Sequence, residues 1–182
     1  MRIHFHTHLG YYELMNEKLK NHFLKIGPRT FVIATVILLL VLDILNGIYL
    51  KLALSKRNLS EMMIVSAYQR MDLSTAELDA ESIAQMTWIL EKSVDFFLFL
   101  ILINNLFFYF FYLRKKLWAQ GYVLFYTLSA AILSVAMLFD VYGMGTSWMI
   151  FNIATIPIYL YLYMGIKLLK NETTLVPKKK GR

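Results

Sequence analysis

Four long apolar stretches constrain this chain more than any other feature of its sequence. They run over residues 30–50, 94–113, 122–140 and 148–169. A helix needs about 20 mostly apolar residues to cross the hydrocarbon of a bilayer, and each stretch is close to that length. Helices are the expected spanning form because lipid cannot hydrogen-bond an open backbone. The sequence therefore predicts an all-α protein, an integral membrane bundle of four transmembrane helices.

The composition supports lipid rather than water as the main solvent. Hydrophobic residues make up 58% of the 182 residues, and charged residues make up 17%. Soluble domains carry about 25% charged residues, and a domain this small has too little interior to bury so much apolar surface. The chain has no cysteine, which excludes disulfides, thiolate metal sites and a thiol nucleophile.

The positive charges predict the orientation of the bundle. Lys and Arg accumulate in cytoplasmic connections. Here they gather before the first stretch, between the second and third, and after the fourth: Arg2, Lys18, Lys20, Lys25, Arg29, Arg114, Lys115, Lys116, Lys167, Lys170, Lys178, Lys179, Lys180 and Arg182. In residues 51–93, five basic residues are matched by six acidic ones. We therefore expect both termini inside, an N-in/C-in topology. The net charge of +7 then points to inner-leaflet lipid and not to nucleic acid.

This topology divides the chain into three parts. Residues 1–29 form a cytoplasmic N-terminal segment, residues 30–169 the transmembrane domain, and residues 170–182 a basic cytoplasmic tail. The connection over residues 51–93 is expected to be a helical extracytoplasmic loop. Its Ser74–Glu77 stretch fits a capping box, and no Gly or Pro separates that stretch from residue 94, so a continuous helix is expected to enter the second span.

The N-terminal segment has two notable patterns. Residues 11–26 fit an amphipathic helix on the inner leaflet, with lysines on one side and four apolar residues towards lipid: Leu14, Leu19, Phe23 and Ile26. His4, His6 and His8 alternate, which would put them on one side of an extended segment, and imidazoles bind metals. Only Glu13 or His22 could be a fourth ligand nearby, so adventitious metal binding is the alternative. Met15 is an alternative start. No cofactor is predicted.

A carboxylate in the first span requires an explanation. Asp43 costs about 2.5 to 3.5 kcal/mol near the bilayer centre on insertion scales, so such a residue faces the bundle interior. Helical spacing places Asn46 on the same face, and Asn105 of the second span is at similar depth. With Tyr109 and Ser129, these residues form a predicted intramembrane polar cluster.

Three further polar residues, Asp95, Asp140 and Asn152, are predicted at the outer mouth of the bundle. In the third span, the inward stripe is expected to hold Tyr122, Tyr126, Ser129, Leu133 and Ala136. Two interpretations of Asp43 stay open. It is protonated and joins helices through hydrogen bonds of about 1 kcal/mol each, or it binds a proton or cation on a path to the outer mouth.

No catalytic constellation is legible, so an enzyme is not predicted. The first hypothesis is an accessory, assembly or sensory subunit that acts through contacts with another membrane protein or with itself. The alternative is a proton- or cation-coupled transporter or channel subunit with Asp43 as the intramembrane acid. A bacterial cytoplasmic (inner) membrane is favoured. The final KKKGR, similar to a dilysine retrieval signal, makes the endoplasmic reticulum membrane the alternative.

Overall fold

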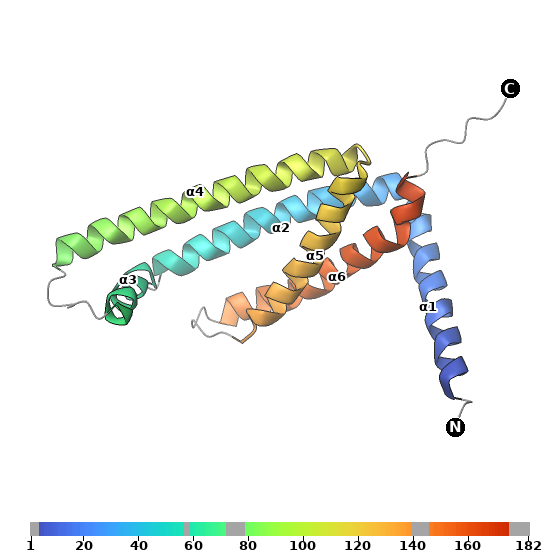
Figure 1. Ribbon diagram of the computed structural model, residues 1–182, viewed down its shortest axis with the longest axis horizontal. Coiled ribbons are helices and arrows are strands. Elements are labelled where there is room, and N and C mark those ends of the chain that lie inside the picture. Colours follow the sequence, from blue (N-terminus) through green and yellow to red (C-terminus); the bar gives the residue numbers. More distant parts are fainter. Residues whose placement is uncertain (1–3, 57–58, 72–78, 140–145, 175–182) are drawn as a thin grey trace. The chain divides into compact units, whose positions relative to one another are not determined.

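The computed structural model describes residues 4–56, 59–71, 79–139 and 146–174, and every regular element in these ranges is a helix. Side chains are described within residues 15–52, 61–71, 79–139 and 146–170. The helices are α1 (His4–Ile26), α2 (Pro28–Lys56), α3 (Leu59–Arg70), α4 (Ala80–Leu113), α5 (Leu117–Ala136) and α6 (Thr146–Thr174) (Figure 1).

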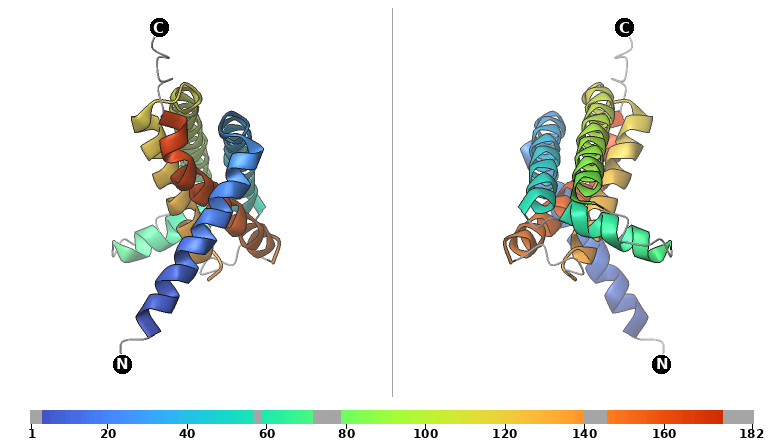
Figure 2. Two further views of the ribbon diagram at one scale, coloured as in Figure 1. Left: turned by 90° about the vertical axis from the view of Figure 1, so that its right-hand side faces the viewer. Right: turned by 90° about the vertical axis from the view of Figure 1, so that its left-hand side faces the viewer.

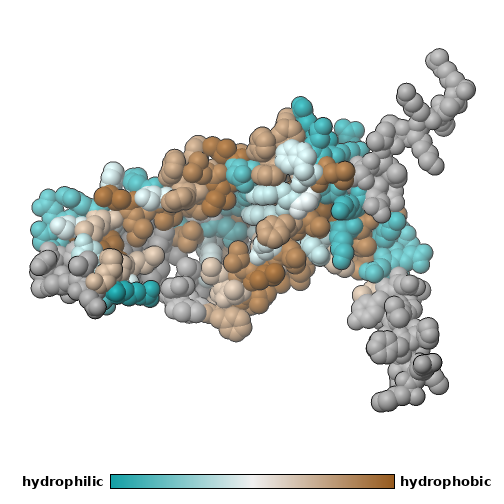
Figure 3. Space-filling view, in the orientation of Figure 1, coloured by the Kyte–Doolittle hydropathy of each residue, from teal (hydrophilic) through white to brown (hydrophobic). Residues whose placement is uncertain are grey.

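Four of these helices are long and apolar enough to cross a membrane. The qualifying segments are Pro28–Leu52, Ala80–Leu113, Leu117–Ala136 and Thr146–Lys170. In Figure 3 the middle of α4 is hydrophobic, whereas its first turns are hydrophilic. These helices confirm the predicted all-α class and the multi-pass membrane character. The N-in/C-in orientation and the bundle stay predictions.

A sharp break separates α1 from α2. Gly27 has φ +86°, a left-handed conformation that favours glycine at a helix end. Its amide donates to the Leu24 carbonyl at 3.1 Å, and its own carbonyl accepts from the Phe31 amide at 2.9 Å. Pro28 follows as the first residue of α2, where a missing amide hydrogen costs least. The first membrane helix therefore starts at Pro28, two residues before the predicted span.

Helix α4 is one continuous helix of 34 residues. Asp79 precedes it, and the Asp79 Oδ1 accepts a hydrogen bond from the Ser82 amide at 2.7 Å, the geometry of an N-cap. Hydrogen bonding from Ser82 lowers the pKa of Asp79. The expected Ser74–Glu77 capping box lies outside the described residues, and Asp79 supplies the cap at the start of α4.

The chain divides into two compact units. Met1–Leu38 together with Phe108–Arg182 form the first, and Leu39–Phe107 form the second. In the first unit α5 packs along α6, and α1 packs across α6 (Figures 1 and 2). Some buried polar side chains in this unit bond within their own helix: the Thr127 hydroxyl donates to the Val123 and Leu124 carbonyls at 3.0 and 2.9 Å.

The buried face of α5 differs from the predicted stripe. Its described buried residues are Ala119, Gln120, Val123, Thr127, Ala131 and Ser134. The expected inward residue Leu133 is 58% exposed, and Ala136 is exposed as well. Tyr122, Tyr126 and Ser129 are half-buried, so the predicted stripe was wrong only for Leu133 and Ala136. Small residues are favoured on the buried face because they let two helix backbones approach closely in a membrane.

In the second unit, α2 and α4 run antiparallel, side by side (Figures 1 and 2). Two polar pairs connect them, Asp43 with Asn105 and Lys51 with Asp95. The short helix α3 runs crosswise to both. The half-buried side of α4 holds Asp95, Leu98 and Leu102, whereas Phe96, Phe97 and Phe99 are exposed.

Candidate functional site

The central polar pair joins Asp43 of α2 to Asn105 of α4. The Asn105 amide nitrogen Nδ2 donates to Asp43 Oδ2 at 3.0 Å. Asn105 is only 1% exposed, and Asp43 is half-buried. Asn104, the neighbour on α4, is exposed. The helical repeat thus turns one amide of the Asn104–Asn105 pair towards the carboxyl group and the other away.

The depth of this pair follows from the charges on α2. Arg29 and Lys51 are separated by 22 residues, or about 33 Å at 1.5 Å per residue, which matches the roughly 30 Å hydrocarbon thickness. Asp43 lies eight residues before Lys51, about 12 Å along the axis. The carboxyl group is therefore near the middle of the apolar stretch, where an amide donor offsets part of its desolvation.

The other predicted members of the polar cluster have different surroundings. Asn46 is half-buried, three residues from Asp43 and on the same side of α2. Tyr109 is buried, and its ring makes an edge contact with Tyr126, with centroids 6.5 Å apart. Ser129 is half-buried on α5. Tyr109 and Ser129 belong to the first unit, so their relation to Asp43 stays a prediction.

A second polar pair lies towards the C-terminal end of α2. The Lys51 ammonium is 3.0 Å from Asp95 Oδ1 and 3.1 Å from Oδ2. The sequence predicted Asp95 as an acid of the outer mouth, whereas the structure pairs it with a lysine. Antiparallel helices explain this: eight residues separate the polar positions on α2 and ten separate them on α4, so both pairs fit one alignment.

The position of the other two residues of the predicted outer mouth relative to Asp95 stays a prediction. Asn152 is buried in the first unit, where its Nδ2 donates to the Trp148 carbonyl at 2.9 Å. Asp140 lies outside the described residues. Ser134 and Thr155, which the outer-mouth prediction missed, place their hydroxyls 3.4 Å apart between α5 and α6. In the sequence, the regular spacing of small residues on α5 could have identified Ser134 as a contact residue.

The predicted histidine arrangement changes because the segment is helical. Helix α1 begins at His4, so residues two positions apart no longer share a side, as they would in an extended segment. The side chains of His4, His6 and His8 lie outside the described set. Among the described residues, no group of three or more His, Asp or Glu side chains could hold a metal ion.

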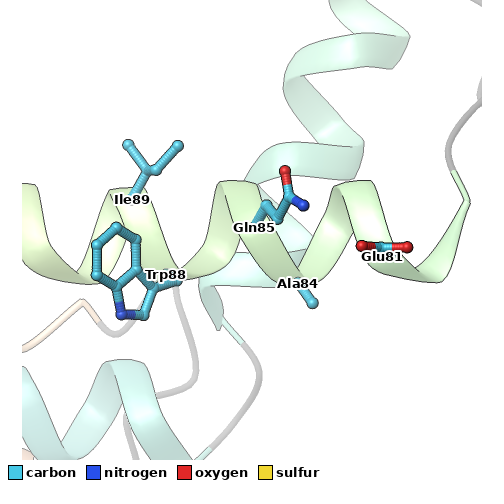
Figure 4. Close-up of a pocket in the computed structure, with 5 residues that line it drawn as sticks. All are labelled: Glu81, Ala84, Gln85, Trp88 and Ile89. Atoms are coloured by element: carbon cyan, nitrogen blue, oxygen red, sulfur yellow. The ribbon is translucent and has the colours of Figure 1, made fainter.

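The start of α4 carries an exposed face that the sequence reasoning did not single out. Glu81, Ala84, Gln85, Trp88 and Ile89 line a shallow, open pocket on one side of the helix (Figure 4). Their spacing of three, four, seven and eight residues from Glu81 is the period of one helix face. Trp88 is 62% exposed and Ile89 56% exposed.

The fold defines a multi-pass integral membrane protein in which two polar pairs of the described residues join α2 and α4. Comparisons of the chain with known protein families, with curated proteins and with solved structures found no match.

Proposed function

We propose that this protein is a non-enzymatic subunit of a membrane assembly, with an accessory, assembly or sensory role, and that the start of α4 contacts its partner. The observation that carries this proposal is the exposure of Trp88 and Ile89 beyond the hydrocarbon. Lipid accounts for exposed apolar side chains within a span, but not for those above it. Exposed apolar groups in water mark interaction sites.

The height of these residues is set by charges on the same helix. Asp95 and Arg114 are 19 residues apart, about 28 Å along α4, so they bracket the hydrocarbon. Trp88 lies seven residues before Asp95, about 10 Å further out. The head-group layer is about 5 to 7 Å thick on each side. Trp88 therefore lies just outside this layer, and Gln85 and Glu81 lie further out.

The proposed orientation has both termini in the cytoplasm and α3 with the start of α4 outside, in a bacterial cytoplasmic membrane. It is supported by the basic residues of the α4–α5 connection, Arg114, Lys115 and Lys116, which are all exposed. Because the chain has no cysteine, Gln85→Cys should react with an impermeant maleimide on intact spheroplasts and Lys115→Cys should not. The reverse labelling pattern would invert the topology.

Photo-crosslinking in native membranes tests the partner contact. A photoreactive amino acid at Gln85 should give one crosslinked species in stoichiometric yield. The same group at Leu90, a half-buried position on the other side of α4, is the matched control. Trp88→Ala with Ile89→Ala should abolish co-purification of the crosslinked companion. Equal crosslinking at both positions, or an unchanged companion in the double variant, would contradict the proposal.

A second candidate function rests on Asp43, which lies mid-span beside Asn105. In this candidate the protein is a proton- or cation-coupled transporter or channel subunit, and the carboxyl group takes up the ion. Asp43→Asn keeps the shape and cannot ionise. In proteoliposomes, loss of ion flux by a normally folded Asp43→Asn variant would favour transport. Wild-type function in that variant would remove this candidate.

A further inference from the structure

Helix α1 is fixed against α6 by an aromatic contact. Phe23 is 0% exposed, and its ring centroid lies 5.2 Å from that of Phe31 and 4.9 Å from that of Tyr161. A Cβ on Gly165 would meet the Phe31 ring and come within 2.9 Å of Phe23 Cε1. The absence of a side chain at Gly165 thus makes room for both rings. The predicted lipid-facing orientation of Phe23 was wrong.

A hydrogen bond supports the same contact. The His22 Nε2 and the Tyr161 hydroxyl are 3.1 Å apart, and their rings meet edge to face. Tyr161 lies six residues before Lys167, about 9 Å along α6. The Lys167 ammonium is 5.9 Å from the centre of the Tyr163 ring, as expected of a lysine extending along its helix to head groups.

The contact therefore fixes the depth of α1 in the membrane. Amphipathic helices that lie in the interface bury their apolar side about 5 to 10 Å into the boundary of head groups and acyl chains. Tyr161, about 9 Å below Lys167 along α6, is at that depth. Helix α1 meets the C-terminal part of α6 at a steep angle (Figures 1 and 2), which is the orientation expected of a helix that lies in the interface beside a spanning helix.

The apolar side of α1 is larger than the area that α6 covers. Met15, Leu19, Phe23 and Ile26 follow at steps of four, four and three residues, which is one helix face. Only Phe23 of this face is buried. Met15 and Ile26 are exposed, and Leu19 is half-buried. The remainder of the face needs an apolar cover.

Positive charge flanks the apolar face of α1. Lys18 and Lys25 are exposed and seven residues apart, so they lie on one face two turns from each other. Arg29, also exposed, begins α2. Glu17 is the one acidic residue between positions 15 and 29. We propose that α1 is a lipid-binding arm, with Met15, Leu19 and Ile26 among acyl chains and Lys18 and Lys25 on the phosphates of anionic phospholipids.

Spin labels on the full-length protein in anionic nanodiscs test the position of α1. Labels at Met15→Cys and Ile26→Cys should collide mainly with oxygen, which concentrates in acyl chains. Labels at Lys18→Cys and Asn21→Cys should collide mainly with a polar nickel complex. Equal nickel accessibility at all four positions would overturn the proposal. Spin–spin coupling between labels on two chains would also overturn it, because a second copy would then cover the face.

Brominated lipids test the preference for anionic head groups. A fluorophore at Met15→Cys should be quenched more strongly by brominated phosphatidylglycerol than by brominated phosphatidylcholine. Lys18→Gln and Lys25→Gln should each reduce the relative affinity for the anionic lipid roughly fivefold. Lys92→Gln, an exposed lysine on α4, is the matched control and should leave the preference unchanged. Unchanged preference in the Lys18 and Lys25 variants would overturn the anionic assignment, whatever the outcome of the partner crosslinking.

Discussion

The two units of the molecule join their membrane helices in different ways. In the first, small residues of α5 such as Ala119, Ala131 and Ser134 are buried where it packs along α6. In the second, α2 and α4 are joined by side chains that reach across, Asp43 with Asn105 and Lys51 with Asp95.

The two kinds of helix contact should tolerate different substitutions. Close backbone contact depends on volume, so added atoms must be destabilising. Polar pairs depend on the presence of a hydrogen-bond donor and an acceptor, because a side chain of similar size without the donor loses the hydrogen bond. The first contact should therefore be sensitive to side-chain volume, and the second to the loss of a donor or acceptor.

The largest expected effect is at Gly165. Gly165→Ala should destabilise the protein by about 1 to 3 kcal/mol, because the new methyl group overlaps the rings of Phe31 and Phe23. Gly121→Ala is the control, since a Cβ at Gly121 meets nothing within 4 Å and alanine favours a helix by about 1 kcal/mol. Thermal unfolding in detergent measures both. Equal changes in stability at the two glycines would contradict a tight contact at Gly165.

A smaller effect is expected for the pair in the middle of the spans. A double-mutant cycle of Asp43→Leu and Asn105→Leu should give a coupling of roughly 0.6 to 1.7 kcal/mol, the range for hydrogen bonds between membrane helices. Asn104→Leu should couple less to Asp43, because Asn104 is on the exposed side. Unfolding in mixed micelles supplies the free energies. Stronger coupling through Asn104 would reverse the assignment of the two amides.

The ion pair between Lys51 and Asp95 should contribute less. Lys51 is exposed and Asp95 half-buried, and exposed ion pairs contribute about 0.2 to 1 kcal/mol. Lys51→Gln should lower stability within that range, and the loss should shrink as salt is added because ions screen the charges. A salt-independent loss would show that Lys51 acts through packing instead.

The smallest effect is the pH response of the α4 start. The pKa of Asp79 is lowered by its hydrogen bonds from Ser82, so the folded state prefers the ionised cap. That contribution is present above the unfolded carboxyl pKa of about 3.9 and is lost as the pH falls through the lower folded value. The Ser82 amide shift should titrate in this acidic window by NMR and stay flat in Asp79→Asn. A titration that persists in the variant would point to another acid.

The sequence predicted the spans well because their signal is the length of an apolar run. It also placed Asn105 towards Asp43, since the helical repeat leaves Asn104 on the opposite side. The face of α5 was not predictable in this way. In lipid, both the protein-facing and the lipid-facing sides of a helix are apolar, so side-chain size, and not polarity, selects the contact.

Two other features were established from the three-dimensional arrangement of the helices. Whether the apolar side of α1 meets lipid or protein cannot be read from its spacing, and Phe23 meets protein because Gly165 leaves room. The pairing of Lys51 with Asp95 depends on the alignment of α2 with α4. The sequence alone could have predicted this alignment, because placing Asp43 opposite Asn105 in two antiparallel helices brings Lys51 to within two residues of Asp95.

The central claim is that α2 and α4 pair antiparallel through their polar atoms inside a membrane. Disulfide crosslinking in native membranes tests it most directly, because the chain has no cysteine of its own. Two cysteine pairs, Asp43→Cys with Asn105→Cys and Lys51→Cys with Asp95→Cys, should form disulfides on mild oxidation. Val41→Cys with Ile103→Cys, at two exposed positions, should not. Crosslinking only in the control pair, or equally in all three, would contradict the account.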